Sequence, residues 1–308
     1  MVVVRAGDAT FAPPGRGPGF PTMTVDTFHP ELSFNLWTYA DTPVTMALEI
    51  AEGHGFRRVG LPAPAVVAAF DQVADQLRRS GLVAAYLMHP PPFTLDEPDR
   101  WPDERSRFEE SVAAAAALGA PVVYTTTANA GRLSWEDAAT AAAEAFGPVR
   151  DHARACGVAL AVETTSQMRQ EYGFVSTLRD LVRLGEQCDL DLCADMYWCW
   201  REPDLARSAA AAVPRLRIVQ LADYALGTTA TPDRRVPGDG VAHLRWVVGL
   251  FYGAGFRGMW DLELVGPHID AEGRAEALAR GGRYVSTLLR EVEGDAVPTW
   301  TYRKDGAT

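Results

Sequence analysis

The 308-residue chain lacks the sequence features that direct a protein to nucleic acid or into a membrane. It has no run of Lys and Arg, and its formal net charge is −11. No basic surface is therefore expected to neutralise phosphates, which excludes a nucleic-acid partner. No apolar run reaches the roughly 20 residues of a membrane-spanning helix, and the alanine-rich stretch 111–120 is too short. We therefore predict no membrane contact and a small molecule as the partner.

Cysteine spacings typical of metal sites are also missing. Cys156, Cys188, Cys193 and Cys199 form no Cys-x-x-Cys pair and no Cys/His metal spacing, and three of them lie in or beside apolar runs. This pattern is typical of free thiols in a core, which persist in a reducing compartment. It predicts a cytoplasmic protein.

The chain is predicted to hold one domain with a segment on either side. Residues 1–28 are rich in Gly and Pro and lack the apolar core of a signal peptide, which predicts a disordered N-terminal extension. Residues 29–294 suffice for one barrel of roughly 250 residues, and 47% of the chain is hydrophobic, enough for a large core. Residues 295–308 form a C-terminal tail.

Short apolar runs alternate with longer amphipathic stretches along the domain. One of these stretches opens with Ser134 and Asp137 at the spacing of a helix N-terminal capping box. Eight such strand–helix units predict an α/β fold, a parallel eight-stranded (β/α)8 TIM barrel. The alternative, a doubly wound open sheet, would favour a Gly-x-Gly-x-x-Gly motif after the first strand, and that motif is missing. The predicted strands span residues 32–39, 56–62, 82–90, 121–128, 157–165, 190–198, 216–224 and 258–264.

Metal-capable oxygen donors close the last four predicted strands. They are Glu163, Asp195, Gln220 and Glu263. The carboxyl ends of the strands of a (β/α)8 barrel meet at one face, where active sites form. A single such residue would fit a salt-bridged strand end, but four in succession predict one metal site.

With these residues in place, the chain resembles the xylose isomerase-like TIM barrels over about residues 30–293. The sequence PDRRVPGDG (232–240) between QLAD and LELVG is similar to a loop of ketose 3-epimerases, and VQLAD is similar to a strand of hydroxypyruvate isomerases. The superfamily also includes AP endonuclease family 2. That activity is not expected, because threonines at 125–127 and Trp198 stand where several zinc-binding histidines are needed.

The resemblance implies one divalent metal ion held by Glu163, Asp195, Gln220 and Glu263. Gln220 departs from the histidine that the epimerases usually have at this position. An amide oxygen suits a hard, octahedral ion better than zinc, which favours Mn²⁺ or Mg²⁺, with Co²⁺ as a further candidate.

The same resemblance implies an isomerase or epimerase acting on a sugar, cyclitol or hydroxy-keto substrate. A divalent ion chelated by adjacent hydroxyl and carbonyl oxygens acidifies the C–H between them and stabilises the enediolate. Glu163 and Glu263 are implied to be the acid/base pair that removes and returns the proton.

Four further residues are predicted to contact the substrate, each with a structural alternative. Arg234 matches a family arginine that reaches into the pocket, but a loop-anchoring salt bridge is an equal alternative. His89 ends the third strand and either binds substrate or closes the strand. Trp198 replaces a family histidine by a large apolar face. Trp37 is one of several aromatic residues near the rim, where stacking on substrate competes with core packing.

Two other functions stay open. The first is a lyase on the same scaffold, of the dehydratase or C-glycoside-cleaving type, although loss of the histidine at Trp198 weakens the dehydratase reading. The second is a non-catalytic barrel that binds a ligand or partner. A homo-oligomer, dimer or tetramer, is expected from the family.

Overall fold

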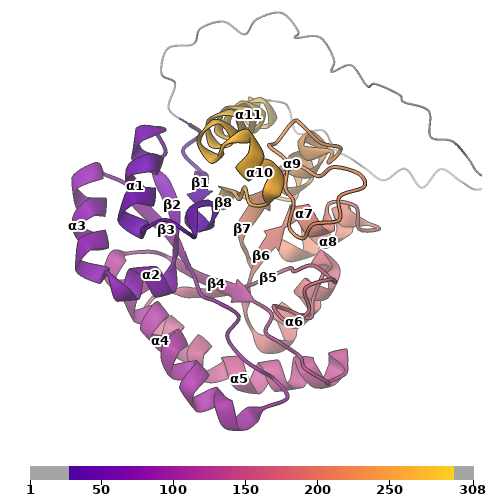
Figure 1. Cartoon of the computed structure of the whole chain (residues 1–308). Helices are drawn as coiled ribbons and strands as arrows, with labels where there is room; N and C mark the ends of the chain where they lie inside the picture. The colour runs from indigo at the N-terminus through magenta and orange to yellow at the C-terminus, as the bar shows by residue number, and fades with distance from the viewer. Residues whose placement is uncertain (1–27, 295–308) are drawn as a thin grey trace, which may run out of the picture.

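Eight parallel strands close into one barrel in the computed structural model, which describes residues 28–294 (Figure 1). Each strand pairs with its sequence neighbours, and β1 pairs with β8 through Leu32 and Trp260. The predicted (β/α)8 TIM barrel is confirmed. The strands are β1 (Leu32–Asn35), β2 (Arg58–Pro62), β3 (Val83–Met88), β4 (Val122–Thr126), β5 (Ala159–Glu163), β6 (Asp191–Asp195), β7 (Leu216–Leu221) and β8 (Met259–Leu262).

A layer of helices surrounds the barrel (Figure 1). At the start of the helix that directly precedes β5, the Asp137 backbone N–H donates a hydrogen bond to Ser134 Oγ at 3.1 Å. This contact confirms the predicted N-terminal cap. The α-helices are α1 (Val44–Gly53), α2 (Ala63–Ala68), α3 (Phe70–Ser80), α4 (Trp101–Leu118), α5 (Trp135–Ala155), α6 (Leu178–Cys188), α7 (Met196–Cys199), α8 (Leu205–Ala212), α9 (Leu244–Gly253), α10 (Pro267–Glu272) and α11 (Arg274–Gly294), and the 3₁₀ turns are η1 (Leu36–Tyr39) and η2 (Pro98–Arg100).

The flanking segments are not covered by this description. Apart from Phe28, the predicted extension 1–28 lies outside the described residues, as does the predicted tail 295–308. Within residues 28–294, no helix is both long and apolar enough to span a bilayer. All four cysteines lie in the described range, and each is a free thiol.

A mixture of small and aromatic side chains fills part of the barrel interior. Tyr86 and Tyr124 pack edge to face with their ring centroids 5.0 Å apart, beside Ala85 and Ala161. The ring of Tyr86 lies over Gly60 on β2, where a Cβ atom would come within 1.9 Å of the ring. Glycine at position 60 is therefore required for a tyrosine at position 86.

Strand alternation brings the predicted donors into the barrel. Side chains along a strand point alternately inward and outward, so a residue two positions after an inward side chain is also inward. Ala161, Cys193, Ile218 and Met259 all lie in the interior cluster. Residues two or four positions further along the same strands therefore form the next interior layers, and these residues are Glu163, Asp195, Gln220, Asp261 and Glu263.

The first strand is shorter than the sequence predicted. It ends at Asn35, and the predicted strand residues 36–39 form the 3₁₀ turn η1. The Asn35 side chain causes this end, because its Oδ1 accepts a hydrogen bond from the Trp37 backbone N–H at 2.9 Å.

Candidate metal centre and catalytic site

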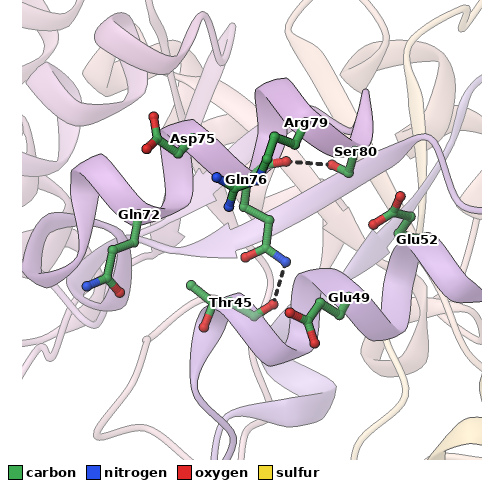
Figure 2. Close-up of a pocket in the computed structure, with 8 residues that line it drawn as sticks. All are labelled: Thr45, Glu49, Glu52, Gln72, Asp75, Gln76, Arg79 and Ser80. Carbon is green, nitrogen blue, oxygen red and sulfur yellow. Dashed lines mark hydrogen bonds between the residues drawn. The ribbon is translucent and has the colours of Figure 1, made fainter.

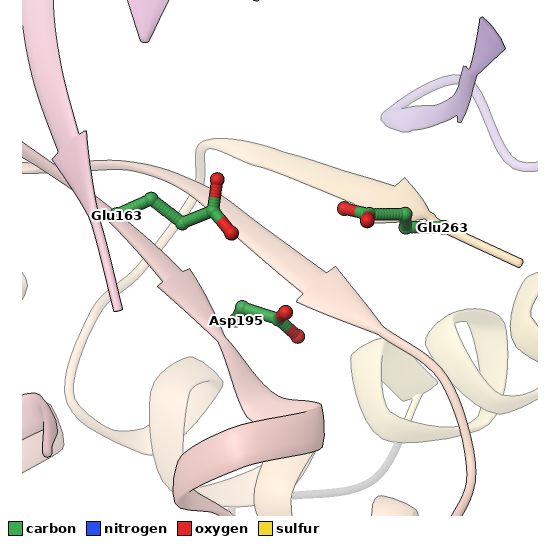
Figure 3. A group of neighbouring side chains, drawn as sticks. All are labelled: Glu163, Asp195 and Glu263. Atoms are coloured by element: carbon green, nitrogen blue, oxygen red, sulfur yellow. The ribbon is translucent and has the colours of Figure 1, made fainter. Parts of the chain in front are cut away.

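Three buried carboxylates meet at the carboxyl-terminal face of the barrel (Figure 3). Glu163 ends β5, Asp195 ends β6, and Glu263 follows β8 directly. One oxygen from each lies within 4.8 Å of the others. Figure 3 shows the three side chains pointing toward one another from separate strands.

The negative charge at this place exceeds the positive charge that the protein supplies. A fourth buried carboxyl, Asp261, lies two residues before Glu263 on β8, and Arg234 is the buried arginine among the described residues. Burial is the largest cause that raises the pKa of Glu263 to about 7 and that of Asp261 to about 6. Burial, followed by the charges of Glu263 and Asp195, raises the pKa of Glu163 well above its usual range. A divalent cation would balance this charge, and the donor set fits one.

Arg234 connects two of the three carboxylates. Its Nη1 and Nη2 donate to Asp195 Oδ1 and Oδ2 at 3.1 and 2.9 Å, and Nη2 also donates to Glu263 Oε1 at 2.9 Å. The guanidinium carbon lies 4.8 Å from the ring centroid of Tyr197. The Nε atom is buried and has no hydrogen-bond partner in the described part of the chain. The structure thus brings the predicted arginine into the site, in contact with the predicted metal ligands.

The loop that carries Arg234 is attached to the segment after β8. The Arg234 backbone N–H donates to Val265 O at 3.1 Å, and the Asp233 carboxylate accepts from the His268 backbone N–H at 3.1 Å. Gly266 has a φ of +125°, and a Cβ there would lie 2.7 Å from Asp233 Cα. The glycine therefore permits the close approach that fixes Arg234 above the barrel.

Gln220 reaches the site, but with its amide nitrogen. Its Nε2 donates to Glu263 Oε2 and to Tyr124 Oη, the latter at 3.2 Å. Its Oε1 accepts a hydrogen bond from Cys193 Sγ at 3.4 Å. The sequence had predicted an oxygen ligand, whereas the structure shows a donor to Glu263. Metal binding by Gln220 stays a prediction. It requires the side-chain amide to rotate so that Oε1, and not Nε2, faces the carboxylates.

Asn35 is a neighbour of Glu263 that the sequence reasoning missed. Its Nδ2 lies 3.2 Å from Glu263 Oε2 and 3.1 Å from Tyr124 Oη. No signal in the sequence indicated this contact, because Asn35 lies in the middle of the predicted strand 32–39. Only the closure of β1 against β8 shows that the amide meets a carboxylate.

The two predicted acid/base glutamates differ in their surroundings. Glu263 accepts hydrogen bonds from Arg234, Asn35 and Gln220. The Glu163 carboxylate makes no hydrogen bond or ion pair with any other described residue, although the residue is only 8% exposed. Glu263 is thus anchored on both oxygens, whereas no described side chain holds the Glu163 carboxylate.

Trp198 lies beside the predicted arginine. The ring sits in α7, contacts Tyr197 edge to face at 4.5 Å, and is centred 5.7 Å from the Arg234 guanidinium carbon. This position places an apolar face next to the charged centre, and contact between Trp198 and substrate stays a prediction.

Trp37 belongs to η1 and is 46% exposed. Its backbone is tied to Asn35, but its side chain makes no hydrogen bond within the described residues. Substrate contact by Trp37 stays a prediction.

His89 is held by the outer helix layer. Its ring stacks on Phe108 of α4 with the centroids 4.1 Å apart, and its Nδ1 lies 2.9 Å from Ser111 Oγ. Burial and then the charge of Arg107 lower the pKa of His89 to about 4, so the ring is neutral at neutral pH. These contacts favour the structural role of the two that the sequence left open, and contact with substrate stays a prediction.

A surface groove between α1 and α3 lies in the helix layer (Figure 2). Gln76 Nε2 donates to Thr45 O at 2.8 Å, and Ser80 Oγ donates to Gln76 O at 2.9 Å. The carboxylates of Glu49 and Glu52 line the same groove, which is formed by residues of these two helices and not by the strand ends. It is therefore separate from the carboxylate site inside the barrel.

A family model described as xylose isomerase-like TIM barrel matches residues 48–284. None of the curated proteins compared with the chain matched it.

Solved structures share the fold at low sequence identity. A protein from Sinorhizobium meliloti 1021 has a TM-score of 0.74 and 23% identity, covering 84% of this chain and 98% of its own. The IolI protein with a bound zinc atom has a TM-score of 0.72 and 17% identity, covering 85% and 99%. D-psicose 3-epimerase from Clostridium cellulolyticum H10, solved with D-tagatose, has a TM-score of 0.68 and 14% identity, covering 85% and 99%.

Proposed function

Since this chain belongs to the xylose isomerase-like TIM barrel family, we propose that it is a divalent-metal-dependent isomerase or epimerase of a sugar, cyclitol or hydroxy-keto compound. The observation that carries the proposal is the group of three buried carboxylates, Glu163, Asp195 and Glu263, whose oxygens lie within 4.8 Å of one another. The epimerase among the structural neighbours agrees with this class of reaction.

The metal ligands are Glu163, Asp195 and Glu263, with Gln220 as a fourth if its amide oxygen turns inward. All of these donors are oxygen atoms, which favours Mn²⁺ or Mg²⁺, with Co²⁺ as a further candidate. When bound, such an ion polarises the carbonyl of a hydroxy-carbonyl compound and so acidifies the adjacent C–H group.

Glu163 is the residue best suited to take the proton from that carbon. Its carboxylate has no hydrogen-bond partner among the described residues, and burial raises its pKa well above the usual range. A carboxylate without hydrogen-bond partners is free to turn toward a substrate carbon and accept its proton. Return of the proton to the opposite face gives an epimer, and return to the neighbouring carbon gives an isomer. Both reactions are balanced without any further reactant.

Glu263 and Arg234 complete the set of reacting and orienting groups. Glu263 faces Glu163 across the site and, in the proposal, starts protonated and donates its own proton to the opposite face of the carbon (Figure 3). Arg234 donates two parallel hydrogen bonds to Asp195 and one to Glu263, and so orients both carboxylates. The same guanidinium stabilises negative charge that develops on a substrate oxygen.

We also propose a compartment and an oligomeric state for the protein. The four free cysteines agree with a reducing compartment such as the cytoplasm. A dimer or tetramer remains the proposed assembly.

The test starts with elemental analysis of protein purified without chelator or metal resin. We expect close to one Mn, Mg or Co ion per chain, and its loss in Glu263→Ala. The protein is then incubated in D₂O with ketoses, aldoses and inososes, and exchange at carbon is followed by NMR.

The outcomes separate the candidate functions. Deuterium in an epimer or isomer supports the proposal. A product that has lost water, or has been cleaved, indicates the lyase alternative. If the protein holds no metal and fails to bind added Mn²⁺, the proposed mechanism is overturned. The non-catalytic barrel that binds a ligand or partner is then the favoured alternative.

A further inference from the structure

Asn35 is buried between a turn and a carboxylate, with only 1% of the residue exposed. On one side its Oδ1 accepts from the Trp37 backbone N–H at 2.9 Å. On the other side its Nδ2 donates to Glu263 Oε2 at 3.2 Å and to Tyr124 Oη at 3.1 Å. One side chain thus connects the end of β1 to the residue that follows β8.

The chemistry of the neighbours allows one orientation of this amide. A backbone N–H can only donate, so the atom that faces Trp37 must be the carbonyl oxygen. An ionised carboxylate can only accept, so the atom that faces Glu263 must be the amide nitrogen. Because both requirements agree, the turn at Trp37 fixes a hydrogen-bond donor against Glu263.

We propose that Asn35 is a positioning residue that holds the Glu263 carboxylate in the orientation needed for metal binding. The inference rests on the proposed function, in which Glu263 is both a metal ligand and a proton carrier. Asn35 and Gln220 hold Oε2, while Arg234 holds Oε1. Hydrogen bonds to both oxygens restrict rotation of the carboxylate about its terminal torsion, which is otherwise broad. Partners that orient metal ligands in this way typically change metal affinity by about 10–100-fold when they are removed.

The composition of the chain offers an unusually direct test. It contains two asparagines, Asn35 and Asn129. Asn129 forms the same type of turn, because its Oδ1 accepts from the Gly131 backbone N–H at 2.9 Å. Its side chain makes no contact with Glu263 in the described structure. Asn129 is therefore a matched control for each measurement on Asn35.

The first measurement detects the contact in metal-free protein labelled with ¹⁵N-asparagine. The spectrum should contain two side-chain NH₂ pairs, and Asn129→Ser assigns them by removing one. Glu263→Gln should move the Asn35 pair and leave the Asn129 pair in place, since of the two asparagines it is Asn35 that donates to Glu263. An Asn35 pair that does not respond to Glu263→Gln would overturn the inference.

The second measurement is the Mn²⁺ dissociation constant of Asn35→Ser, by calorimetry or by EPR of free Mn²⁺. Serine retains an oxygen that can accept from the Trp37 N–H but is too short to reach Glu263. We expect Mn²⁺ binding at least about 10-fold weaker than in the wild type, with Asn129→Ser unchanged. Unchanged affinity in Asn35→Ser would overturn the positioning role even if the NMR contact is present.

Failure of the proposed function has its own signature. Wild-type protein that binds no Mn²⁺ contradicts the metal-dependent mechanism, and with it the purpose that the inference assigns to Asn35. If the wild type binds Mn²⁺ and only Asn35→Ser is impaired, both proposals are supported. Near-UV circular dichroism on every variant confirms that the fold is retained.

Discussion

Arg234 forms a bidentate ion pair with Asp195, in which Nη1 and Nη2 donate hydrogen bonds to Oδ1 and Oδ2 at 3.1 and 2.9 Å. The two side chains are 39 positions apart in the chain, and both are buried. This pair places a permanent positive charge beside the proposed metal ligands. Asp195 and Glu263 are therefore partly neutralised before any cation binds, and Arg234 fixes their directions.

Arg234→Met should destabilise the metal-free protein. The change leaves buried carboxylates without their cation, and breaking a buried ion pair from one side costs about 3–5 kcal/mol. Urea unfolding in the presence of chelator measures the loss. The neighbouring Arg235→Met is the control, because Arg235 pairs with Asp233 nearer the surface and should cost less than about 1 kcal/mol. Equal stability of Arg234→Met and the wild type would contradict the role of Arg234.

Glu163→Gln and Glu263→Gln should each lower turnover by at least about 100-fold, because neither amide can exchange a proton with carbon. Deuterium uptake from solvent measures this loss. Glu163→Gln should keep the wild-type stability or raise it, since the Glu163 carboxylate has no hydrogen-bond partner among the described residues. Glu104→Gln replaces a buried glutamate of α4 and should keep turnover. Full activity in either site variant would rule out the acid/base pair.

The metal-free protein should become less stable as the pH rises from about 4.5 to about 7. Burial raises the pKa of Glu263 from 4.5 to about 7, so in this window the folded chain binds more protons than the unfolded chain. The shift corresponds to a loss on the order of 3 kcal/mol at the upper end of the window. Urea unfolding with chelator at pH 5 and pH 8 measures it. Glu263→Gln should show a smaller decrease, and an identical pH profile would count against the raised pKa.

Added Mn²⁺ should raise the melting temperature more at pH 8 than at pH 5. Metal binding requires ionised ligands, and protons compete with the cation when the carboxyl pKa values are raised. A thermal shift that does not depend on pH would indicate that the metal binds elsewhere.

Trp198→His should widen the range of polar substrates. The replacement removes an apolar face beside Arg234 and adds a smaller group that forms hydrogen bonds. The kcat/KM values of the variant and the wild type for a panel of ketoses and inososes measure this change in substrate range. Trp135→His is the control, since Trp135 also contacts an aromatic ring and an arginine but belongs to α5. No gain with Trp198→His would count against its position in the pocket.

His89→Ala should reduce stability and leave KM unchanged. The ring stacks on Phe108, and deleting a buried ring of this size costs about 3 kcal/mol. Urea unfolding and steady-state kinetics on the same preparation separate the two effects. A raised KM at wild-type stability would instead establish the substrate contact.

Much of the strand pattern could be predicted because it is local. The eight predicted apolar runs coincide with the eight strands, and the errors lie at their ends, as at Asn35, where a side-chain cap turns the chain into η1. The inward direction of Glu163, Asp195 and Glu263 also follows from alternation along a strand. Both the apolar runs and the alternation along a strand can be recognised within a few consecutive residues of a sequence.

The direction of individual side chains was harder to predict. His89 and Gln220 were both assigned from their positions at strand ends. The structure turns His89 toward α4, and it presents the nitrogen of Gln220 to Glu263. Each outcome depends on a neighbour from another element, which no local pattern identifies.

Hydrophobic periodicity and residue type are enough to predict the barrel and the strand ends that carry carboxylates. How these groups meet depends on the folded structure. The Asn35–Glu263 contact joins residues 228 positions apart, and it exists because β1 closes the barrel beside β8. The chain fixes which donors and acceptors are present, but a hydrogen bond needs an atom within about 3 Å in the right direction, and barrel closure alone sets that distance.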